Sequence, residues 1–305
     1  MELGIFMMPV HHPDKPWGQA LGEDREAVIL ADRLGYSEAW IGEHFSSKPE
    51  QIPSPMMFLA SLIGEAPNIR FGTGVVNLPH HNPIVVAAEA AMFDRLSGGR
   101  LMLGIGPGGL FSDAELFGHD DMGERYRMAM EALDIIIELW RTQAPLHIDG
   151  EFWKVRLETN VWPYGGIGDL SRPLQEPHPP IAMAITGPGG RTAEIIAERD
   201  CIPISTNLAP VDIVAAQWSA YAAARDKLNR PADREIWRVC RNILVTESEQ
   251  QAHEALSDPN AALPFYYRYL RVLRRIPELR ELGDDAGPVE LDELFLKPSR
   301  MGLVE

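Results

Sequence analysis

The sequence predicts an α/β fold, a TIM-type (β/α)8 barrel forming one domain over residues 1–305. Short apolar runs alternate with longer amphipathic runs, the pattern of parallel strands joined by helices. Seven such units can be followed, and 305 residues suit one large barrel. Glycine-rich and polar clusters follow the strands, where barrel enzymes carry their active sites. An open parallel sheet is the alternative architecture.

The first four strand–helix units occupy residues 3–140. Short apolar runs predict strands at residues 3–8, 38–41, 70–76 and 101–105. Apolar residues at helical spacing predict helices at residues 24–34, 55–64, 83–96 and 123–140. Gly35 fits the end of the first helix, and Pro55 and Pro83 fit the opening turns of the next two.

Residues 146–180 interrupt the alternation after the fourth unit, so we interpret them as an insertion. Asp149-Gly150 is a turn signal between two short alternating runs, and it predicts a hairpin at residues 146–157. The remainder of the insertion is rich in glycine and proline and has no periodicity.

The second half of the chain returns to strand–helix order. Strands are expected at residues 181–185, 202–205 and 237–246, and helices at 190–198 and 210–228 and from about 249. A helix at 265–275 falls in the segment 258–300, which we interpret as a lid or a tail. No eighth strand is visible, so the eighth unit is expected to be absent or incomplete.

Composition excludes several classes of protein. The chain has 28 Lys and Arg against 44 Asp and Glu, a formal charge of −16, which disfavours binding to nucleic acids or anionic membranes. Cys201 and Cys240 are far apart, which argues against a zinc site and suits a reducing cytoplasm. No basic leader and no membrane-spanning apolar run is visible, so a cytoplasmic enzyme is expected.

Four clusters at strand ends are candidate site residues. In a barrel these ends lie on one face, so their shared location is stronger support than any single cluster. The clusters are Glu43-His44, Asn77–Asn82, Gly104–Gly109 and Thr186–Thr192.

His44 is the candidate catalytic residue. An imidazole at a strand end can act as a general base near neutral pH, and Glu43 is its candidate orienting carboxylate. A histidine merely hydrogen-bonded in a loop is the plainer interpretation. Neither His80 nor His81 predicts a metal site, because adjacent residues in an extended loop point apart and no carboxylate has a suitable spacing.

Gly104, Gly106 and Gly109 match the GxGxxG pattern, but the context argues against a dinucleotide-binding fold. Pro107 removes one backbone N–H, and the residues after the motif do not predict a strong amphipathic helix. Either a tight loop or the close approach of a flat ring to bare backbone explains these glycines.

The segment 186–192 is the better anion site. It follows a strand and opens a helix, so free N–H groups and the positive end of the helix dipole converge there. The expected phosphate-binding residues are Thr186, Gly187, Gly189, Gly190 and Arg191. The plainer interpretation is that Thr186 caps the helix and binds no ligand.

Four motifs follow one another along the chain: Trp40-Ile-Gly-Glu-His44, Gly72-Thr-Gly-Val-Val-Asn-Leu-Pro, Pro83 and Asp94-Arg-Leu-Ser-Gly-Gly-Arg100. Together they resemble the bacterial luciferase-like flavin-dependent monooxygenases. Two further motifs, Gly104-Ile-Gly-Pro-Gly and Ser112-Asp-Ala, are closer to the limonene-monooxygenase-like branch. The match runs in order from Leu3 to about Gly190.

The resemblance implies a barrel that binds reduced FMN, supplied by a separate NAD(P)H-dependent flavin reductase. It implies that O2 forms a flavin C4a-peroxide and that His44 serves as a base or peroxide-stabilising group. Gly74 and Val75 match a segment that often carries a non-proline cis peptide beneath the ring, and Gly106 matches a ring-edge contact. Thr186 and the glycines after it match the phosphate loop.

Two departures from the family pattern bear on the substrate. Pro107 stands where luciferases can carry a phosphate-binding arginine, so Arg191 would take that role. Phe45 replaces the usual second histidine, which favours a small, mostly apolar substrate contacted by Phe45 and His80. A homodimer is expected from the resemblance, with helices 55–64 and 83–96 as interface material.

Two other functions remain open. An F420-dependent oxidoreductase can use the same barrel, although its polyanionic cofactor tail suits a more cationic protein. A non-catalytic flavin-binding protein is suggested by the missing eighth strand.

Overall fold

The computed structural model describes residues 2–258, 264–266 and 269. Contacts divide the chain into two compact units, residues 1–9 with 16–184 and residues 10–15 with 185–305, which are described separately. Among the described residues, no helix has both the length and the apolar character needed to cross a membrane. The single-domain interpretation stays a prediction.

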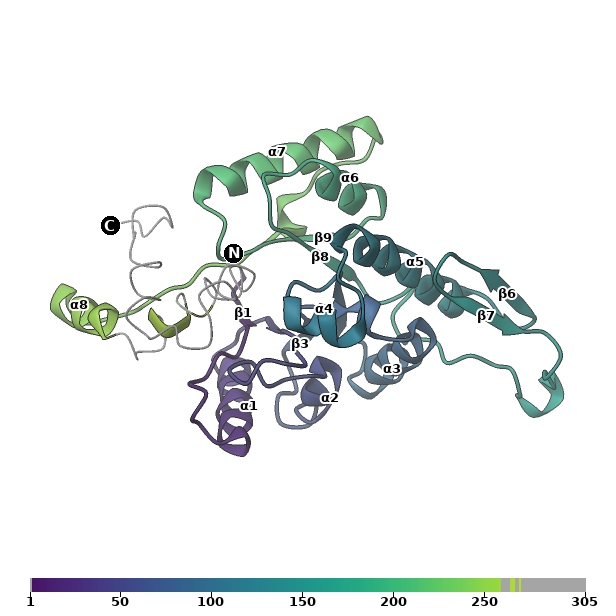
Figure 1. Cartoon of the computed structure of the whole chain (residues 1–305), viewed down its shortest axis with the longest axis horizontal. Coiled ribbons are helices and arrows are strands. Elements are labelled where there is room, and N and C mark those ends of the chain that lie inside the picture. Colours follow the sequence, from purple (N-terminus) through teal and green to yellow (C-terminus); the bar gives the residue numbers. More distant parts are fainter. Residues whose placement is uncertain (1, 259–263, 267–268, 270–305) are drawn as a thin grey trace. The chain divides into compact units, whose positions relative to one another are not determined.

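The first unit is built on a parallel sheet (Figure 1). Its strands pair in the order β1-β2-β3-β5-β8, and the register aligns Phe6 with Trp40 and Trp40 with Gly72. A short strand, β4, pairs in parallel with the end of β5. The strands are β1 (Gly4–Met7), β2 (Glu38–Ile41), β3 (Arg70–Thr73), β4 (Val76–Asn77), β5 (Leu101–Gly106) and β8 (Ile181–Ile185).

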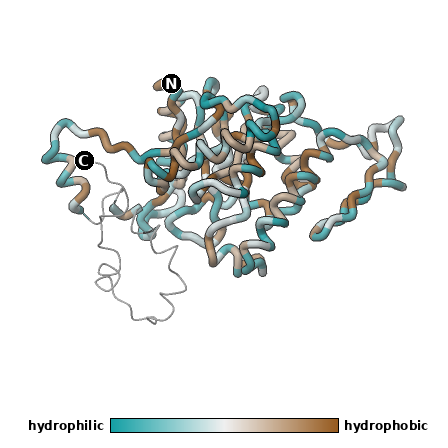
Figure 2. Tube along the Cα trace, turned by 90° about the horizontal axis from the view of Figure 1, so that it is seen from above, coloured by the Kyte–Doolittle hydropathy of each residue, from teal (hydrophilic) through white to brown (hydrophobic). Residues whose placement is uncertain are grey.

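The described part of the first unit contains five α-helices. Hydrophobic and hydrophilic residues are interspersed along the traced chain (Figure 2), and each of these helices has buried residues on it. In α5 the buried face includes Met128, Ala132 and Ile136, and Asp121 caps the N-terminus by accepting the N–H of Glu124. The helices are α1 (Trp17–Arg33), α2 (Pro55–Ala60), α3 (Pro83–Leu96), α4 (Phe111–Phe117) and α5 (Met122–Arg141).

The insertion contains the predicted hairpin. Strands β6 (Leu146–Asp149) and β7 (Lys154–Leu157) pair antiparallel, and Glu131 of α5 accepts three backbone N–H groups of their turn. Further along, buried Asp94 accepts the N–H groups of Leu174 and Gln175, each at 2.8 Å. These carboxylates attach the hairpin turn to α5 and residues 174–175 to α3.

The described part of the second unit contains a parallel strand pair and the α-helices α6, α7 and α8. Strand β9 (Ile202–Ser205) pairs with β10 (Arg238–Val239). The N-terminus of α8 is capped by Ser248, which accepts the N–H of Gln251. The helices are α6 (Arg191–Glu198), α7 (Val211–Lys227) and α8 (Glu249–Ser257).

Several predicted boundaries are wrong, each for a local reason. Helix α1 begins at Trp17 instead of residue 24, directly after Pro16, whose ring cannot continue a helix backwards. The strand expected at 70–76 is divided into β3 and β4 around Gly74 and Val75. Helix α2 ends at Ala60, four residues earlier than expected.

The strand expected at 237–246 is reduced to the two residues of β10. The apolar residues that suggested a longer strand are exposed, Ile243 by 79% and Val245 by 86%. Residues 111–117, for which no strong helix was predicted, form α4. The expected helix at 265–275 and the lid or tail at 258–300 lie outside the described residues except for 258, 264–266 and 269.

The α/β class and the parallel pairing of the strands are therefore confirmed, and the insertion follows the fourth predicted strand–helix unit as expected. Closure into a complete (β/α)8 barrel stays a prediction, as does the state of the eighth unit.

Candidate active site

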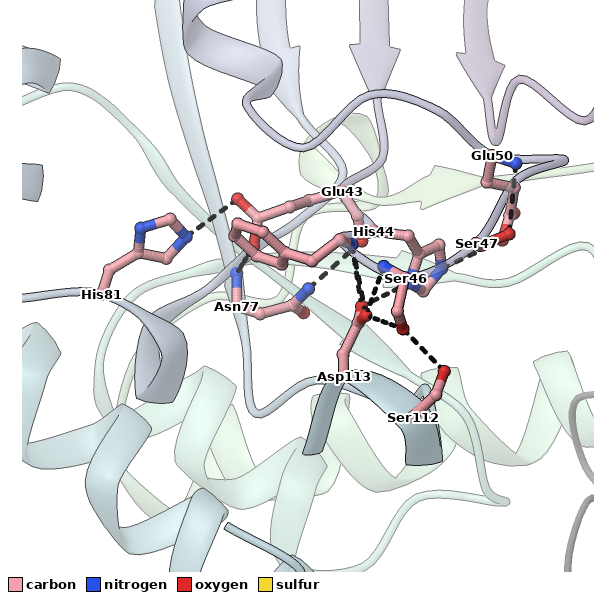
Figure 3. Close-up of polar contacts among 10 residues, drawn as sticks. Glu43, His44, Ser46, Ser47, Glu50, Asn77, His81, Ser112 and Asp113 are labelled. Carbon is pink, nitrogen blue, oxygen red and sulfur yellow. Dashed lines mark hydrogen bonds and ion pairs between the residues drawn. The ribbon is translucent and has the colours of Figure 1, made fainter. Parts of the chain in front are cut away.

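His44 lies just after β2 and is held between two carboxylates (Figure 3). Its Nδ1 is 3.2 Å from Oδ2 of Asp113, and its Nε2 is 3.2 Å from Oε2 of Glu50. The imidazole side chain is 11% exposed, and the two carboxylates are almost fully buried. Because each ring nitrogen faces an anionic oxygen, the geometry suits an imidazolium that donates from both nitrogens.

Asp113, from the first turn of α4, fixes the loop after β2. Its carboxylate accepts the backbone N–H groups of Phe45 and Ser46 as well as the hydroxyl of Ser46. Burial alone would raise the pKa of Asp113, but the bonds from His44 and Ser46 outweigh burial and lower it from 3.8 to about 2. Asp113 is therefore a carboxylate at neutral pH.

The pKa of His44 is raised above its ordinary value. Burial is the largest single effect and lowers the pKa, but the hydrogen bond to Asp113 and the charges of three carboxylates together outweigh it. The charged form of His44 is thus favoured more than it is in a free imidazole.

Glu43 does not orient His44, contrary to the sequence-based expectation. Its side chain accepts the N–H of Asn77 at 2.9 Å and pairs with Nε2 of His81 at 3.0 Å (Figure 3). Successive residues leaving a strand point to opposite sides, so Glu43 and His44 serve different clusters. Glu43 links the ends of β2 and β4.

An aromatic cluster lies beside the His44 loop. His80 stacks on Phe117 of α4 with ring centroids 4.5 Å apart, and Phe45 meets Phe117 edge to face at 4.9 Å. Burial is the largest effect on His80 and outweighs the opposing charge of Asp113, so that its pKa is lowered to about 4. His80 is therefore neutral at pH 7, and the cluster offers an apolar surface.

The expected ring-contacting residues lie at the junction of β3, β4 and β5. The Gly74–Val75 peptide bond is cis, as the resemblance implies. A Cβ on Gly104 would lie 1.9 Å from the carbonyl oxygen of Thr73, and one on Gly106 would lie 2.8 Å from Val75. Packing between strands thus explains both glycines without a ligand.

In the second unit, the loop from Thr186 to Arg191 joins β8 to α6. Gly189 and Gly190 have φ values of +122° and +73°, which favour glycine. Gln217 of α7, fully buried, donates to the carbonyl oxygen of Gly187 at 2.6 Å. A Cβ on Gly187 or Gly190 would meet no atom within 4 Å, so there is open space beside this backbone.

Thr186 and Arg191 are exposed, and neither takes the helix-capping position. The N-cap of α6 is Gly190, so the expectation that Thr186 caps the helix is wrong. The Arg191 guanidinium pairs with Glu194 at 3.3 Å and with Glu198 at 3.0 Å. These acids compete with a phosphate for the arginine.

Sequence reasoning missed the two carboxylates of the His44 site. Asp113 stands in a quoted motif, Ser112-Asp-Ala, but it received no role because no helix was predicted there. Glu50 lies in the loop after His44 and carries no motif. The available signal was the position of Asp113 shortly after the glycine-rich segment 104–109, at the end of a predicted strand.

A family model described as luciferase-like monooxygenase matches residues 1–296 of this chain. The chain belongs to the luciferase-like monooxygenase family. The resemblance drawn from the motifs is therefore confirmed, and the enzyme class of this chain is that of the flavin-dependent monooxygenases.

Three relatives are named monooxygenases. The 4-hydroxyprotoasukamycin monooxygenase of Streptomyces nodosus subsp. asukaensis is 34% identical, covering 85% of this chain and 68% of its own length. Limonene 1,2-monooxygenase of Rhodococcus erythropolis is 32% identical, covering 88% of this chain and 66% of its own length. The oxygenase component of the flavin-dependent trigonelline monooxygenase of Acinetobacter baylyi is 29% identical, covering 93% and 77%. The chain spans about two thirds of the length of the first two relatives.

Two solved structures share the fold. The oxygenating constituent of 3,6-diketocamphane monooxygenase from Pseudomonas putida, solved in complex with FMN, has a TM-score of 0.79 at 21% identity, covering 97% of this chain and 83% of that one. An F420-dependent secondary alcohol dehydrogenase has a TM-score of 0.65 at 18% identity, covering 84% and 73%. At these identities the likeness establishes the fold alone.

Proposed function

We propose that this chain is a flavin-dependent monooxygenase that uses reduced FMN and O2 to oxygenate a small, mostly apolar organic substrate. The observation that carries the proposal is the His44 imidazole, held with a carboxylate 3.2 Å from each ring nitrogen beside the aromatic cluster. The named activities of the relatives support the same enzyme class.

The residues at the β3–β5 junction fit the flat ring of a flavin. Val75 is half-buried within a stretch, residues 71–80, whose other members are all buried, so its side chain is available for contact. We assign Gly74, Val75 and Gly106 to the ring. When bound, reduced FMN supplies the electrons that activate dioxygen.

The β8–α6 loop fits the FMN phosphate. Its glycines leave open space beside the backbone at the N-terminus of an eight-residue helix, where N–H groups favour an anion. We assign the phosphate to five residues. They are Thr186, Gly187, Gly189, Gly190 and Arg191. In this proposal Arg191 exchanges its ion pairs with Glu194 and Glu198 for one with the phosphate.

His44 supplies the proton chemistry. As an imidazolium it holds a proton at each nitrogen, and the proton at Nε2 becomes available when Glu50 turns away. The chain's own geometry therefore favours His44 as a proton donor or a positive charge, instead of the general base expected from its position alone. Asp113 keeps the ring oriented.

Phe45 and His80 contact the substrate in this proposal. Together with Phe117 they form the apolar surface beside His44, and a water-poor surface suits chemistry that must exclude side reactions. We do not assign a metal to the site.

The chain's partners follow from the same proposal. The trigonelline relative is named as an oxygenase component, which supports a separate NAD(P)H:flavin reductase here. Exposed apolar residues on α2 and α3, including Met57, Val85 and Met92, support a homodimer. We place the protein in the cytoplasm.

Replacing His44 with Ala tests the proposal. The variant should bind reduced FMN with affinity close to that of the wild-type chain, while oxygenation turnover falls by about 10²-fold or more. As a control, His178→Ala removes a histidine outside the site, whose Nδ1 lies 2.8 Å from the carbonyl oxygen of Pro179. Unchanged turnover in the His44 variant would remove that residue from the mechanism.

An F420-dependent oxidoreductase is the second candidate function, because an F420-dependent dehydrogenase shares the fold. Hydride transfer to or from F420, without oxygen uptake in the presence of reduced FMN, would favour it. Tight FMN binding with neither activity would favour a non-catalytic flavin-binding protein.

A further inference from the structure

His80 is a buried imidazole whose two ring nitrogens have no hydrogen-bond partner among the described residues. The residue is 8% exposed, so solvent does not satisfy these atoms either. Leaving buried polar atoms unpaired costs stability, and natural proteins seldom do so without a functional reason.

Neighbouring residues fix the orientation of this ring. Phe117 stacks on its face with an interplanar angle of 7°, and Phe45 meets it at 77° with centroids 5.9 Å apart. Gly108, with φ +81°, lies beside the Nε2 edge, where a Cβ would be 3.4 Å from Nε2. Glycine at 108 thus keeps side-chain carbon away from that nitrogen.

The contrast with the adjacent histidine is informative. His81 is 26% exposed in its side chain and pairs with Glu43 at 3.0 Å, so its nitrogen serves the fold. His80 has the same chemistry, is more buried and makes no such bond. Its nitrogens are therefore available to a molecule that enters the aromatic cluster.

We propose that His80 recognises a neutral oxygen atom on an otherwise apolar substrate, donating a ring N–H to a ketone or hydroxyl oxygen. The proposal rests on the proposed monooxygenase function and narrows its substrate class. A neutral imidazole carries one donor and one acceptor, so it pairs with uncharged polar groups, and a carboxylate or phosphate on the substrate is disfavoured.

A stability comparison tests whether the His80 nitrogens serve the fold. In urea unfolding of the full chain, His80→Phe keeps the stacked ring and should leave the midpoint unchanged or raise it. The matched control His81→Phe removes the ring nitrogen that pairs with buried Glu43, so it should lower the midpoint. If His80→Phe lowers the midpoint as much as the control does, buried water satisfies the ring and the proposal is wrong. His80→Met applies the same test with a flexible apolar side chain.

A binding comparison tests the ligand. Menthone and menthane share one carbon skeleton and differ by a ketone oxygen, and their affinities for the FMN-loaded chain can be measured by headspace partitioning. The ratio of the two affinities should fall by about tenfold in His80→Phe, since one hydrogen bond is lost, and should persist in His81→Phe. An unchanged ratio, or no binding of either compound to the wild-type chain, overturns the proposal.

The failure of this inference is distinguishable from the failure of the proposed function. Titration with reduced FMN and oxygen uptake measure the function without reference to His80. A chain that binds and oxidises reduced FMN but shows no preference for the ketone refutes the substrate class alone.

Discussion

Replacing Asp113 with Asn should destabilise the protein and discharge His44. The wild-type carboxylate is 1% exposed and accepts bonds from the His44 ring, from the N–H groups of Phe45 and Ser46, and from the Ser46 hydroxyl. An amide of the same shape keeps some of these bonds but turns an NH2 group toward donors. A buried NH2 group facing other donors is a repulsive contact.

The pKa of Asp113 sets the size of the effect. It falls from 3.8 to about 2, and a shift of this size is worth about 1–2 kcal/mol at neutral pH after a discount for screening. The buried NH2 group that Asn turns toward these donors adds a separate cost of about 1–2 kcal/mol. The free energy of unfolding should therefore fall by roughly 2–4 kcal/mol at pH 7.

The pH dependence has a definite sign. Because the folded-state pKa of Asp113 is depressed, its contribution is present above 3.8 and is lost as the pH falls through about 2. The difference between wild type and variant, measured by urea unfolding, should shrink across that window. NMR titration of His44 should show a lower pKa in the variant, since the Asp113 hydrogen bond is the largest effect that raises it.

Asp121→Asn is the control for this experiment. Asp121 is an exposed N-cap, and Asn caps a helix about as well as Asp, so the control should change stability by less than about 0.5 kcal/mol. If Asp113→Asn costs no more than the control, or if its cost does not depend on pH, the reasoning about the His44 clamp is refuted.

Three further predictions concern other parts of the molecule. Asp94→Asn should lower the unfolding free energy by about 2–3 kcal/mol and expose the end of the insertion to limited proteolysis, and an unchanged cleavage pattern would contradict its anchoring role. Gln217→Leu removes the donor to Gly187 and should weaken FMN affinity by about tenfold in a fluorescence titration, whereas equal affinity would separate that loop from the cofactor. Glu50→Gln should lower the pKa of His44 in an NMR titration, because it removes one of the charges that raise that pKa. A group with a raised pKa contributes stability that is lost as the pH rises through that pKa, so the variant should lose the His44 contribution at a lower pH. An unchanged pKa of His44 would exclude its pairing with Glu50.

Much of the fold could be predicted because local signals agreed with tertiary structure. Four predicted elements match the structure at both ends, β2, α3, β8 and β9, and each has its signal within its own sequence. Asn82 caps α3 and Pro83 opens it, for example. The strand expected at 237–246 failed because apolar composition does not say whether a neighbouring strand is long enough to pair with it.

The site was harder to predict, since its geometry depends on contacts distant in sequence. Asp113 is 69 residues from His44, and only the helix α4 brings its carboxylate to the ring. Glu43 was chosen as the partner because it is adjacent, but adjacency along a strand places side chains on opposite faces. His44 itself was found because strand ends in a parallel α/β fold gather at one edge.

Rapid mixing of the reduced-FMN complex with dissolved oxygen tests the central claim most directly. The account predicts tight binding of reduced FMN, followed by a long-lived absorbance that differs from both reduced and oxidised FMN and decays faster in His44→Ala. Reoxidation at the rate of free FMN, with no such phase and no effect of the His44 substitution, would contradict it.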